Sequence, residues 1–441
     1  MLDYSENMAY LCLMKNYRKR VADSILQENL EAAGLVLIEG TKWCGKTTTA
    51  EQIAGSVIYL NDPEHSESYL ALSQNSPGIL LRGDTPRLID EWQDAPELWD
   101  AARFEVDHRE TKTGQFIFTG STVIPKEKRE KIKHSGTGRA AWMTMRPMSL
   151  WESGESNGQM SLGSLFSGTA GPGCQSAELD IEQLAWLICR GGWPAALTMS
   201  KKGALRQSLN YIDAIANNDI SAVDGVGRDK EFTLRLLRSY ARFQGAQAPV
   251  TSIYKDLKAN ADECLSPETV SSYISALKKL FVVEDAPAWN PNLRSKTAIR
   301  TSDTRYFVDP SIATASLGIG PEDLISDLKT MGFLFETLCI RDLRVYTEAL
   351  DGKLYHYRDK NDLECDAVLH LRNGKYGLIE IKLGGQDLIE EGASSLTALS
   401  SKIDTGKMTE PSFLMVLCGT GAYAYKRKDG VWVVPISCLK D

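Results

Sequence analysis

Residues 40–47 of the chain read Gly40-Thr41-Lys42-Trp43-Cys44-Gly45-Lys46-Thr47, which fills every fixed position of the spacing G-x-x-x-x-G-K-[ST]. A short apolar run, residues 35–38, precedes this stretch, and residues 47–54 follow it with a helical pattern. Glycines in such a loop let backbone N–H groups turn inward around phosphate oxygens, and the next helix presents its N-terminus to the anion. The stretch therefore predicts a strand, a phosphate-binding loop and a helix. A chance match in a turn is the alternative.

The side chains of this loop have separate expected tasks. Lys46 would reach the β- and γ-phosphates of a nucleotide, and the Thr47 hydroxyl would bind Mg2+. ATP and Mg2+ are therefore the expected cofactors. The residues expected to bind them run through the loop into the first turn of the helix: Gly40, Thr41, Lys42, Trp43, Cys44, Gly45, Lys46, Thr47 and Thr48.

A second acidic motif follows at residues 87–91, Arg87-Leu88-Ile89-Asp90-Glu91. It is typical of the Walker B strand end, where Asp90 would hold the metal and Glu91 would polarise the attacking water. The apolar lead-in has only two residues, so a surface acidic pair in front of Trp92 is the alternative interpretation.

Two further candidates lie downstream of this motif. Thr119 ends the apolar run of residues 116–118, where a hydroxyl could sense the γ-phosphate or position the water; a simple Gly-Ser turn after a strand is the alternative. Arg139 follows Gly136-Thr137-Gly138 in a loop, and an arginine there could stabilise charge during phosphoryl transfer in its own subunit or in a neighbouring one. A solvated surface arginine explains the sequence equally well, and a homo-oligomer is left open.

The composition limits the class of protein. A length of 441 residues indicates two or three domains, and a net charge of −8 excludes a general polyanion binder, so any nucleic-acid contact must use a local basic patch. The nine cysteines are odd in number and form no C-x-x-C pair, which favours a reducing, cytoplasmic location. No apolar run approaches the ~20 residues that span a bilayer, so no membrane contact is expected.

Helices and short strands alternate up to residue 152, which predicts an α/β domain with a parallel sheet. Residues 153–176 are rich in Gly and Ser and are predicted to be a loop, linker or insertion. Three helices at residues 233–243, 250–258 and 266–280, then a β-like segment and a basic stretch, are typical of a winged helix, whose second helix commonly enters a DNA groove. The alternative is a module that only packs between domains. The expected phosphate-contacting residues are Lys278, Lys279, Arg294, Lys296 and Arg300.

The last part of the chain has a helix at residues 333–345, then strands near 353–357, 366–371 and 376–383. Alternation along the last of these puts Glu380 and Lys382 on one face, and Asp366 opens the strand before it. An acid followed by E-x-K is the PD-(D/E)xK pattern of magnesium nucleases, in which Asp366 and Glu380 would bind the metal and Lys382 would stabilise charge or help activate water. Glu336 is a candidate fourth polar member. An ordinary exposed strand face with alternating charges is the alternative.

These motifs, in their order, resemble a family of prokaryotic AAA-type ATPases with a C-terminal domain of uncharacterised function. The resemblance implies an AAA-type ATPase domain over residues 1–152, the Gly/Ser linker and a helical winged-helix-like part over 153–305, and a restriction-endonuclease-like α/β domain over 306–441. The Gly/Ser stretch after Trp151 departs from the family pattern. The resemblance rests on the phosphate loop, Ile89-Asp90-Glu91, Phe118-Thr119-Gly120-Ser121, Gly138-Arg139, Arg146-Pro147-Met148-Ser149-Leu150, Gly191-Gly192-Trp193-Pro194, Tyr211-Ile212, residues 332–336, Tyr357-Arg358-Asp359, Glu364-Cys365-Asp366 and Ile379-Glu380-Ile381-Lys382.

Three functions are compatible with this pattern. The first is an ATP-hydrolysing, DNA-associated protein with a nuclease-like C-terminal domain. The second is a nucleotide-switched DNA-binding or regulatory protein whose C-terminal domain is catalytically inert. A small-molecule kinase is disfavoured by the Asp90-Glu91 pair and by the large additional domains.

Overall fold

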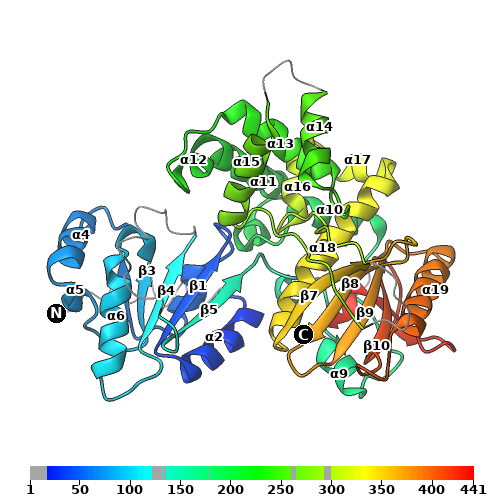
Figure 1. The fold of residues 1–441 in the computed structure, drawn as a ribbon, viewed down its shortest axis with the longest axis horizontal. Coiled ribbons are helices and arrows are strands. Elements are labelled where there is room, and N and C mark those ends of the chain that lie inside the picture. The colour runs from blue at the N-terminus through cyan, green and yellow to red at the C-terminus, as the bar shows by residue number, and fades with distance from the viewer. Residues whose placement is uncertain (1–16, 122–131, 133–135, 178, 260–264, 293–298) are drawn as a thin grey trace. The chain divides into compact units, whose positions relative to one another are not determined.

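The computed structural model describes residues 17–121, 132, 136–177, 179–259, 265–292 and 299–441 (Figure 1). It divides into two compact units. One comprises residues 1–146 with 223–225, and the other comprises residues 147–222 and 226–441. The three-domain division with boundaries at 152 and 305 stays a prediction. Within the described part of the chain, no helix has the length and apolar character that a membrane crossing needs.

The N-terminal unit is built on a parallel sheet, as the sequence predicts. Its strands follow the spatial order β2-β3-β4-β1-β5, and every neighbouring pair runs parallel. Their carboxyl ends therefore share one edge, which is where parallel α/β sheets usually bind ligands. The strands are β1 (Leu35–Gly40), β2 (Ser56–Tyr59), β3 (Arg87–Asp90), β4 (Phe116–Gly120) and β5 (Ala140–Met145).

Helices cover both faces of this sheet (Figure 1). Leu35 and Leu37 of β1 pack on one face with α6, whereas Val36 and Ile38 pack on the other with α2 and α3. Burial on both faces explains why β1 is a continuous apolar run. The helices are α2 (Val21–Ala32), α3 (Lys46–Glu51), α4 (Ser66–Asn75), α5 (Pro77–Leu80), η1 (Trp92–Asp94) and α6 (Glu97–His108).

The Gly/Ser-rich stretch is folded, so its prediction as a loop or linker is wrong. It begins at the end of α8 (Leu150–Ser153) and contains β6 (Met160–Ser161) and α9 (Leu162–Ser167), and β6 pairs with β13 (Leu439–Lys440). The buried side chains Met160, Leu162, Leu165 and Phe166 form the apolar side of this segment. Its serines and glycines serve as helix caps: the Ser161 hydroxyl accepts from the Ser164 N–H, and Gly168 ends α9 at φ 73°.

The predicted helices of the middle region are confirmed. The region contains α10 (Ile181–Arg190), η2 (Pro194–Thr198), α11 (Lys201–Ala214), η3 (Ile215–Asp219), α12 (Ile220–Ala222), α13 (Lys230–Arg242), α14 (Val250–Lys258) and α15 (Pro267–Lys279). After α15 the chain forms an antiparallel pair, in which the Glu284 N–H donates to the Tyr306 carbonyl and Ala286 exchanges two hydrogen bonds with Thr304.

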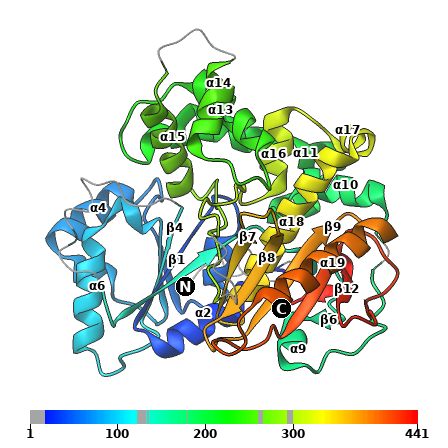
Figure 2. The same ribbon diagram turned by 45° about the vertical axis from the view of Figure 1, so that its right-hand side comes forward.

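A mixed sheet completes the second unit, in the order β11-β12-β10-β9-β8-β7. Strands β7, β8 and β9 are antiparallel, whereas β9, β10 and β12 are parallel. Helix α18 packs on β7, β8 and β9, and α19 packs on β8, β9 and β10 (Figure 2). The elements are α16 (Pro310–Leu317), α17 (Pro321–Ser326), α18 (Leu328–Glu348), β7 (Gly352–Arg358), β8 (Glu364–Leu371), β9 (Tyr376–Lys382), α19 (Gln386–Lys402), β10 (Phe413–Cys418), β11 (Tyr425–Lys426), β12 (Trp432–Pro435) and η4 (Ile436–Cys438).

Candidate nucleotide site and a second acidic site

The phosphate loop joins β1 to α3 through positions that require glycine. Gly40 has φ 146°, and a Cβ there would lie 2.0 Å from the Met145 carbonyl oxygen. Gly45 precedes α3 at φ 101°. Residues that carry a side chain rarely adopt either of these backbone conformations. The buried Lys46 ammonium donates to the carbonyls of Gly40 and Thr41, both at 2.9 Å, so the loop curls around its own lysine.

Arg20, which was not predicted from the sequence, stabilises the phosphate loop through hydrogen bonds to backbone carbonyls. Its buried guanidinium donates to the Cys44 carbonyl and to the Arg146 carbonyl, each at 2.8 Å. The Cys44 thiol also donates to the Met145 carbonyl at 3.4 Å. No local motif identifies Arg20, because it lies two dozen residues before the carbonyl that it supports.

Asp90 is the centre of a hydroxyl cluster at the carboxyl edge of the sheet. Its Oδ1 atom accepts hydrogen bonds from Thr47 Oγ1 at 2.7 Å and from Thr119 Oγ1 at 2.5 Å. The strand register explains the meeting, because β4 lies between β1 and β3 and pairs Thr119 with both Ile38 and Asp90. The structure thus brings together Thr47, Asp90 and Thr119, each of which belongs to a different sequence motif.

Glu91 follows β3 directly and lies beside the same edge. Its backbone is left-handed, with φ 54° and ψ 45°. The Gln93 side-chain amide donates to Glu91 Oε2, and Ser121 Oγ lies 3.5 Å from the same oxygen. Gln93 was not recognised in the sequence, since no general motif includes the second residue after the acidic pair.

Arg139 lies at the opposite edge of the sheet, so the structure does not bring it to the phosphate loop of its own chain. Its carbonyl accepts from the N–H groups of Gly34 and Leu35 at the start of β1, and its guanidinium pairs with Asp107 at 2.9 Å. That hydrogen bond lowers the pKa of Asp107. Five further strand residues at ~3.3 Å each separate this edge from Gly40. A role toward a neighbouring subunit stays a prediction.

In the second unit, the side chains of Asp366, Glu380 and Lys382 meet beside α19. The Ile381 N–H donates to Asp366 Oδ2 at 2.7 Å, and Lys382 Nζ lies 3.0 Å from Glu380 Oε2. Glu380 is buried and its Oε1 atom has no hydrogen-bond partner in the described structure. Glu336, on α18, accepts a hydrogen bond from the Tyr306 hydroxyl.

Burial and the charges of neighbouring acids raise the pKa of each of these acids. Burial raises the pKa of Asp366 to about 6, and burial followed by the charge of Asp366 raises the pKa of both Glu380 and Glu336 well above normal. Burial alone would lower the pKa of Lys382, but the charges of Glu380 and Asp366 outweigh it and the net shift is upward. The described residues contain no group of three or more His, Cys, Asp or Glu side chains that could hold a metal ion.

The predicted basic patch is partly neutralised by neighbouring acids. Lys278 pairs with Asp285 at 2.7 Å, and Arg300 pairs with Asp362 at 2.7 Å. Arg305 is buried against Asp285. Arg294 and Lys296 lie outside the described residues.

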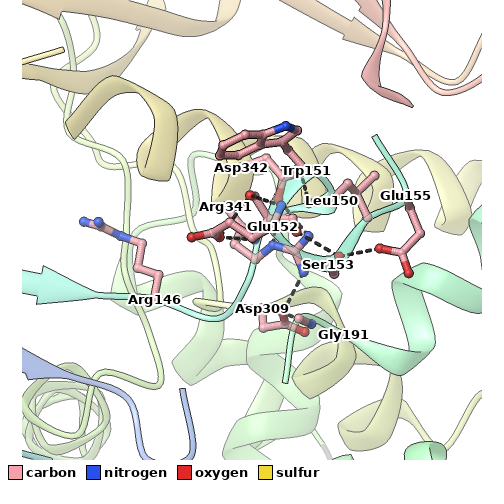
Figure 3. A network of polar contacts seen from close by, with 12 residues as sticks. Arg146, Leu150, Trp151, Glu152, Ser153, Glu155, Gly191, Asp309, Arg341 and Asp342 are labelled. Atoms are coloured by element: carbon pink, nitrogen blue, oxygen red, sulfur yellow. Dashed lines mark hydrogen bonds and ion pairs between the residues drawn. The ribbon is translucent and has the colours of Figure 1, made fainter. Parts of the chain in front are cut away.

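A buried polar network fixes the segment after residue 146 within the second unit (Figure 3). Arg341 on α18 pairs with Asp309 at 2.9 Å and with Asp342 at 2.7 Å. These acids in turn accept backbone N–H groups of distant segments, Gly192 to Asp309 and Leu150 to Asp342, each at 2.9 Å. The network explains why residues 147–153 pack with the C-terminal elements.

Three family models match parts of the chain: an AAA domain over residues 32–153, a domain of unknown function (DUF8612) over 181–323 and a domain of unknown function (DUF4143) over 331–439. The first spans β1 to β5, so the N-terminal unit contains an AAA-type P-loop domain. No curated protein matches the chain.

Several solved structures are similar to the chain. A Walker-type ATPase of Pyrococcus abyssi has 14% identity and a TM-score of 0.42, over 68% of this chain and 96% of that one. A RuvB variant of Thermotoga maritima has 16% identity and a TM-score of 0.26, over 60% and 88%. The Orc1 protein of Aeropyrum pernix in complex with DNA has 14% identity and a TM-score of 0.24, over 72% and 98%. At these scores the similarities carry no argument about function.

Proposed function

We propose that this chain is a Mg2+-dependent ATPase that works on or at DNA. The observation that carries the first half is the cluster in which Thr47, Asp90 and Thr119 meet beside the buried Lys46. A hydroxyl and a carboxylate are hard oxygen ligands of the kind Mg2+ prefers, so Thr47 and Asp90 are the residues that would hold it. Held there together with ATP, Mg2+ would offset the negative charge of the phosphates.

The remaining side chains have roles that follow from their positions. Lys46 would exchange its two carbonyl partners for phosphate oxygens, and the N–H groups of the glycine loop would surround the same anion. Glu91, the residue that follows Asp90 and lies outside the hydroxyl cluster, would orient and deprotonate the attacking water. Thr119 would hold Asp90 in place through its 2.5 Å hydrogen bond.

The test is ATP binding and phosphate release by the wild type and by Glu91→Gln, with Glu67→Gln on the exposed surface of α4 as the matched control. The Glu91 variant should bind ATP like the wild type and hydrolyse it ~10² times more slowly or worse, because only the transition state needs the base. Hydrolysis by this variant at the wild-type rate would contradict the assigned role. Phosphate release without an added acceptor separates an ATPase from a kinase.

A second candidate function concerns the C-terminal acids. We propose a divalent-metal site for phosphodiester cleavage at Asp366, Glu380 and Lys382 in a restriction-endonuclease-like fold. The specific support is the buried Glu380 Oε1 atom without a partner, since an orphaned carboxylate oxygen is costly and a cation would satisfy it. Lys382 would stabilise the charge on the phosphate. The alternative hypothesis is a catalytically inert C-terminal domain that binds its ligand without cleaving DNA.

Calorimetric titration with Mg2+ and Mn2+, together with plasmid cleavage, distinguishes these views. In the absence of ATP, Asp366→Asn should abolish cleavage and the metal binding that belongs to this C-terminal site, whereas Asp387→Asn, an exposed acid at the start of α19, should alter neither. Metal binding without cleavage of any DNA would favour the inert domain. Failure of the wild type to bind either metal would exclude the site.

DNA association is supported by the charge of the three helices α13, α14 and α15. They carry eight Lys or Arg residues and three acids, a net charge of +5 in a chain of −8. A helix-turn-helix with a following β-pair could place such charges against phosphates. The ion pairs of Lys278 and Arg300 favour the rival view that part of the patch is structural.

A further inference from the structure

The chain makes an unusual turn immediately after the Asp90 strand. Glu91 is one of the few non-glycine residues in the described structure with a positive φ, and the 3₁₀ turn Trp92–Asp94 starts at the next residue. Such a conformation is strained for a side-chain-bearing residue and persists only where its surroundings enforce it. Here the buried Trp92 supplies that anchor, since its ring lies 5.1 Å from Trp99 and 5.7 Å from Phe118.

The turn brings Gln93 back alongside Glu91. The Gln93 amide donates to Glu91 Oε2, and its Oε1 atom lies over Gly120, where an added Cβ would be only 2.8 Å away. The hydroxyl of Ser121 approaches the same Glu91 oxygen from the end of β4. Among the described residues, Glu91 Oε1 accepts no hydrogen bond, so one carboxylate oxygen is held and the other remains for a water molecule.

We propose that Gln93 is a positioning residue for ATP hydrolysis, which aligns the Glu91 carboxylate through Oε2 so that Oε1 can accept from the attacking water. The inference rests on the proposed ATPase function. A neutral amide suits this task because it donates to the carboxylate without adding a charge that would compete for Mg2+ or phosphate. Gly120 completes the arrangement by leaving space for the amide where any larger residue would displace it.

The test uses the full-length protein and the near-isosteric change Gln93→Met, which keeps the volume but removes the donor. Steady-state hydrolysis and ATP affinity are measured for Gln93→Met, for Glu91→Gln and for the double variant. Gln74→Met, on the exposed side of α4, is the matched control. A misaligned reacting group commonly costs up to ~10²-fold in rate, so kcat should fall roughly 10- to 100-fold while KM and the Kd for ATP stay within about two-fold.

The double variant separates alignment of Glu91 from general packing. If Gln93 acts through Glu91, adding Gln93→Met to Glu91→Gln lowers the rate no further, because the two changes remove one function. Additive losses, an unchanged kcat in the single variant, or a loss of ATP affinity equal to the loss of rate would each overturn the proposal. Absence of hydrolysis by the wild type would instead remove the proposed function and the inference with it.

Discussion

The two acidic sites of the molecule are supported in opposite ways. In the N-terminal unit, neighbouring side chains donate to the carboxylates: two threonine hydroxyls to Asp90 and the Gln93 amide to Glu91. In the second unit, burial raises the pKa of Asp366, burial and the charge of Asp366 raise those of Glu380 and Glu336, and one buried oxygen of Glu380 has no partner in the described structure. The first site is arranged before any ligand arrives.

This difference in the support of the carboxylates indicates which kind of ligand each site would bind. A carboxylate that already accepts hydrogen bonds from neighbouring side chains keeps its position when a nucleotide binds. A buried cluster of acids is costly while it is charged and becomes favourable when a proton or a cation enters it. We therefore expect ligands to change rates at the first site and stability at the second.

The largest effect should come from Lys46→Ala, which removes the buried ammonium group that donates to the Gly40 and Thr41 carbonyls of the phosphate loop. Loss of a transition-state contact of this kind commonly costs ~10²–10³ in rate, and hydrolysis should fall at least that far. Phosphate release measures the effect. Lys19→Ala, on the exposed surface of the same unit, should leave the rate unchanged. Comparable losses in both variants would mean that the loop lysine has no special role.

The second effect is a pH dependence of stability that belongs to the C-terminal unit. Burial raises the pKa of Asp366 in the folded state to about 6, above its ordinary value of 3.8. The contribution of this protonated carboxyl to the stability of the fold is therefore fully present below about pH 4 and is lost as pH rises through 6. The loss should be of the order of 1–3 kcal/mol in the free energy of unfolding. Urea unfolding between pH 4 and 7 measures it.

Asp366→Asn should reduce this pH dependence of stability, and Mn2+ should restore stability to the wild type but not to the variant. Exposed Asp387→Asn is the control and should keep the wild-type pH profile. If the variant and the wild type lose stability in parallel, other groups are responsible.

A smaller effect is expected from Arg20→Met. The change removes both hydrogen bonds that brace Cys44 and Arg146, so the loop should hold phosphate less firmly. Hydrogen bonds from charged groups contribute about 1.5–3 kcal/mol, and we expect the Kd for ATP to rise about ten-fold or more. Fluorescence titration with a nucleotide analogue provides the measurement. Arg82→Met, at an exposed position of the same unit, should bind like the wild type.

The smallest effect should come from Arg300→Gln, because its pair with Asp362 is solvent-exposed. Exposed ion pairs contribute about 0–1 kcal/mol, so stability should change by less than that. Removal of one phosphate contact should reduce the salt dependence of DNA binding by about one unit of slope. An unchanged slope with a measurable loss of stability would assign Arg300 to the structural pair.

The sequence predicts the parts of the fold that are local. The phosphate loop, the strand ending at Asp90 and the threonine of β4 are recognisable because each depends on residues within a few positions. Arg20, Gln93 and the true place of Arg139 depend instead on strand order and packing, which no short pattern encodes. Residues 153–176 were predicted to be a loop because they are rich in Gly and Ser, but these residues also cap helices. The helical spacing of the apolar residues Leu162, Leu165 and Phe166 is the pattern that indicates α9.

The pairing of β6 with β13 has a consequence for synthesis. Met160 is made 279 residues before its partner Leu439, and the Ser156 hydroxyl donates to the same distant segment at 2.7 Å. At roughly 5–20 residues per second, the partner follows after about 15–60 s. The AAA-type unit can fold as it leaves the ribosome. The apolar side chains of Met160, Leu162 and Phe166, in contrast, stay exposed to solvent until the C-terminal segment has been synthesised. This interval is when the nascent chain depends most on chaperones, and slowing translation late in the message should lower the soluble yield.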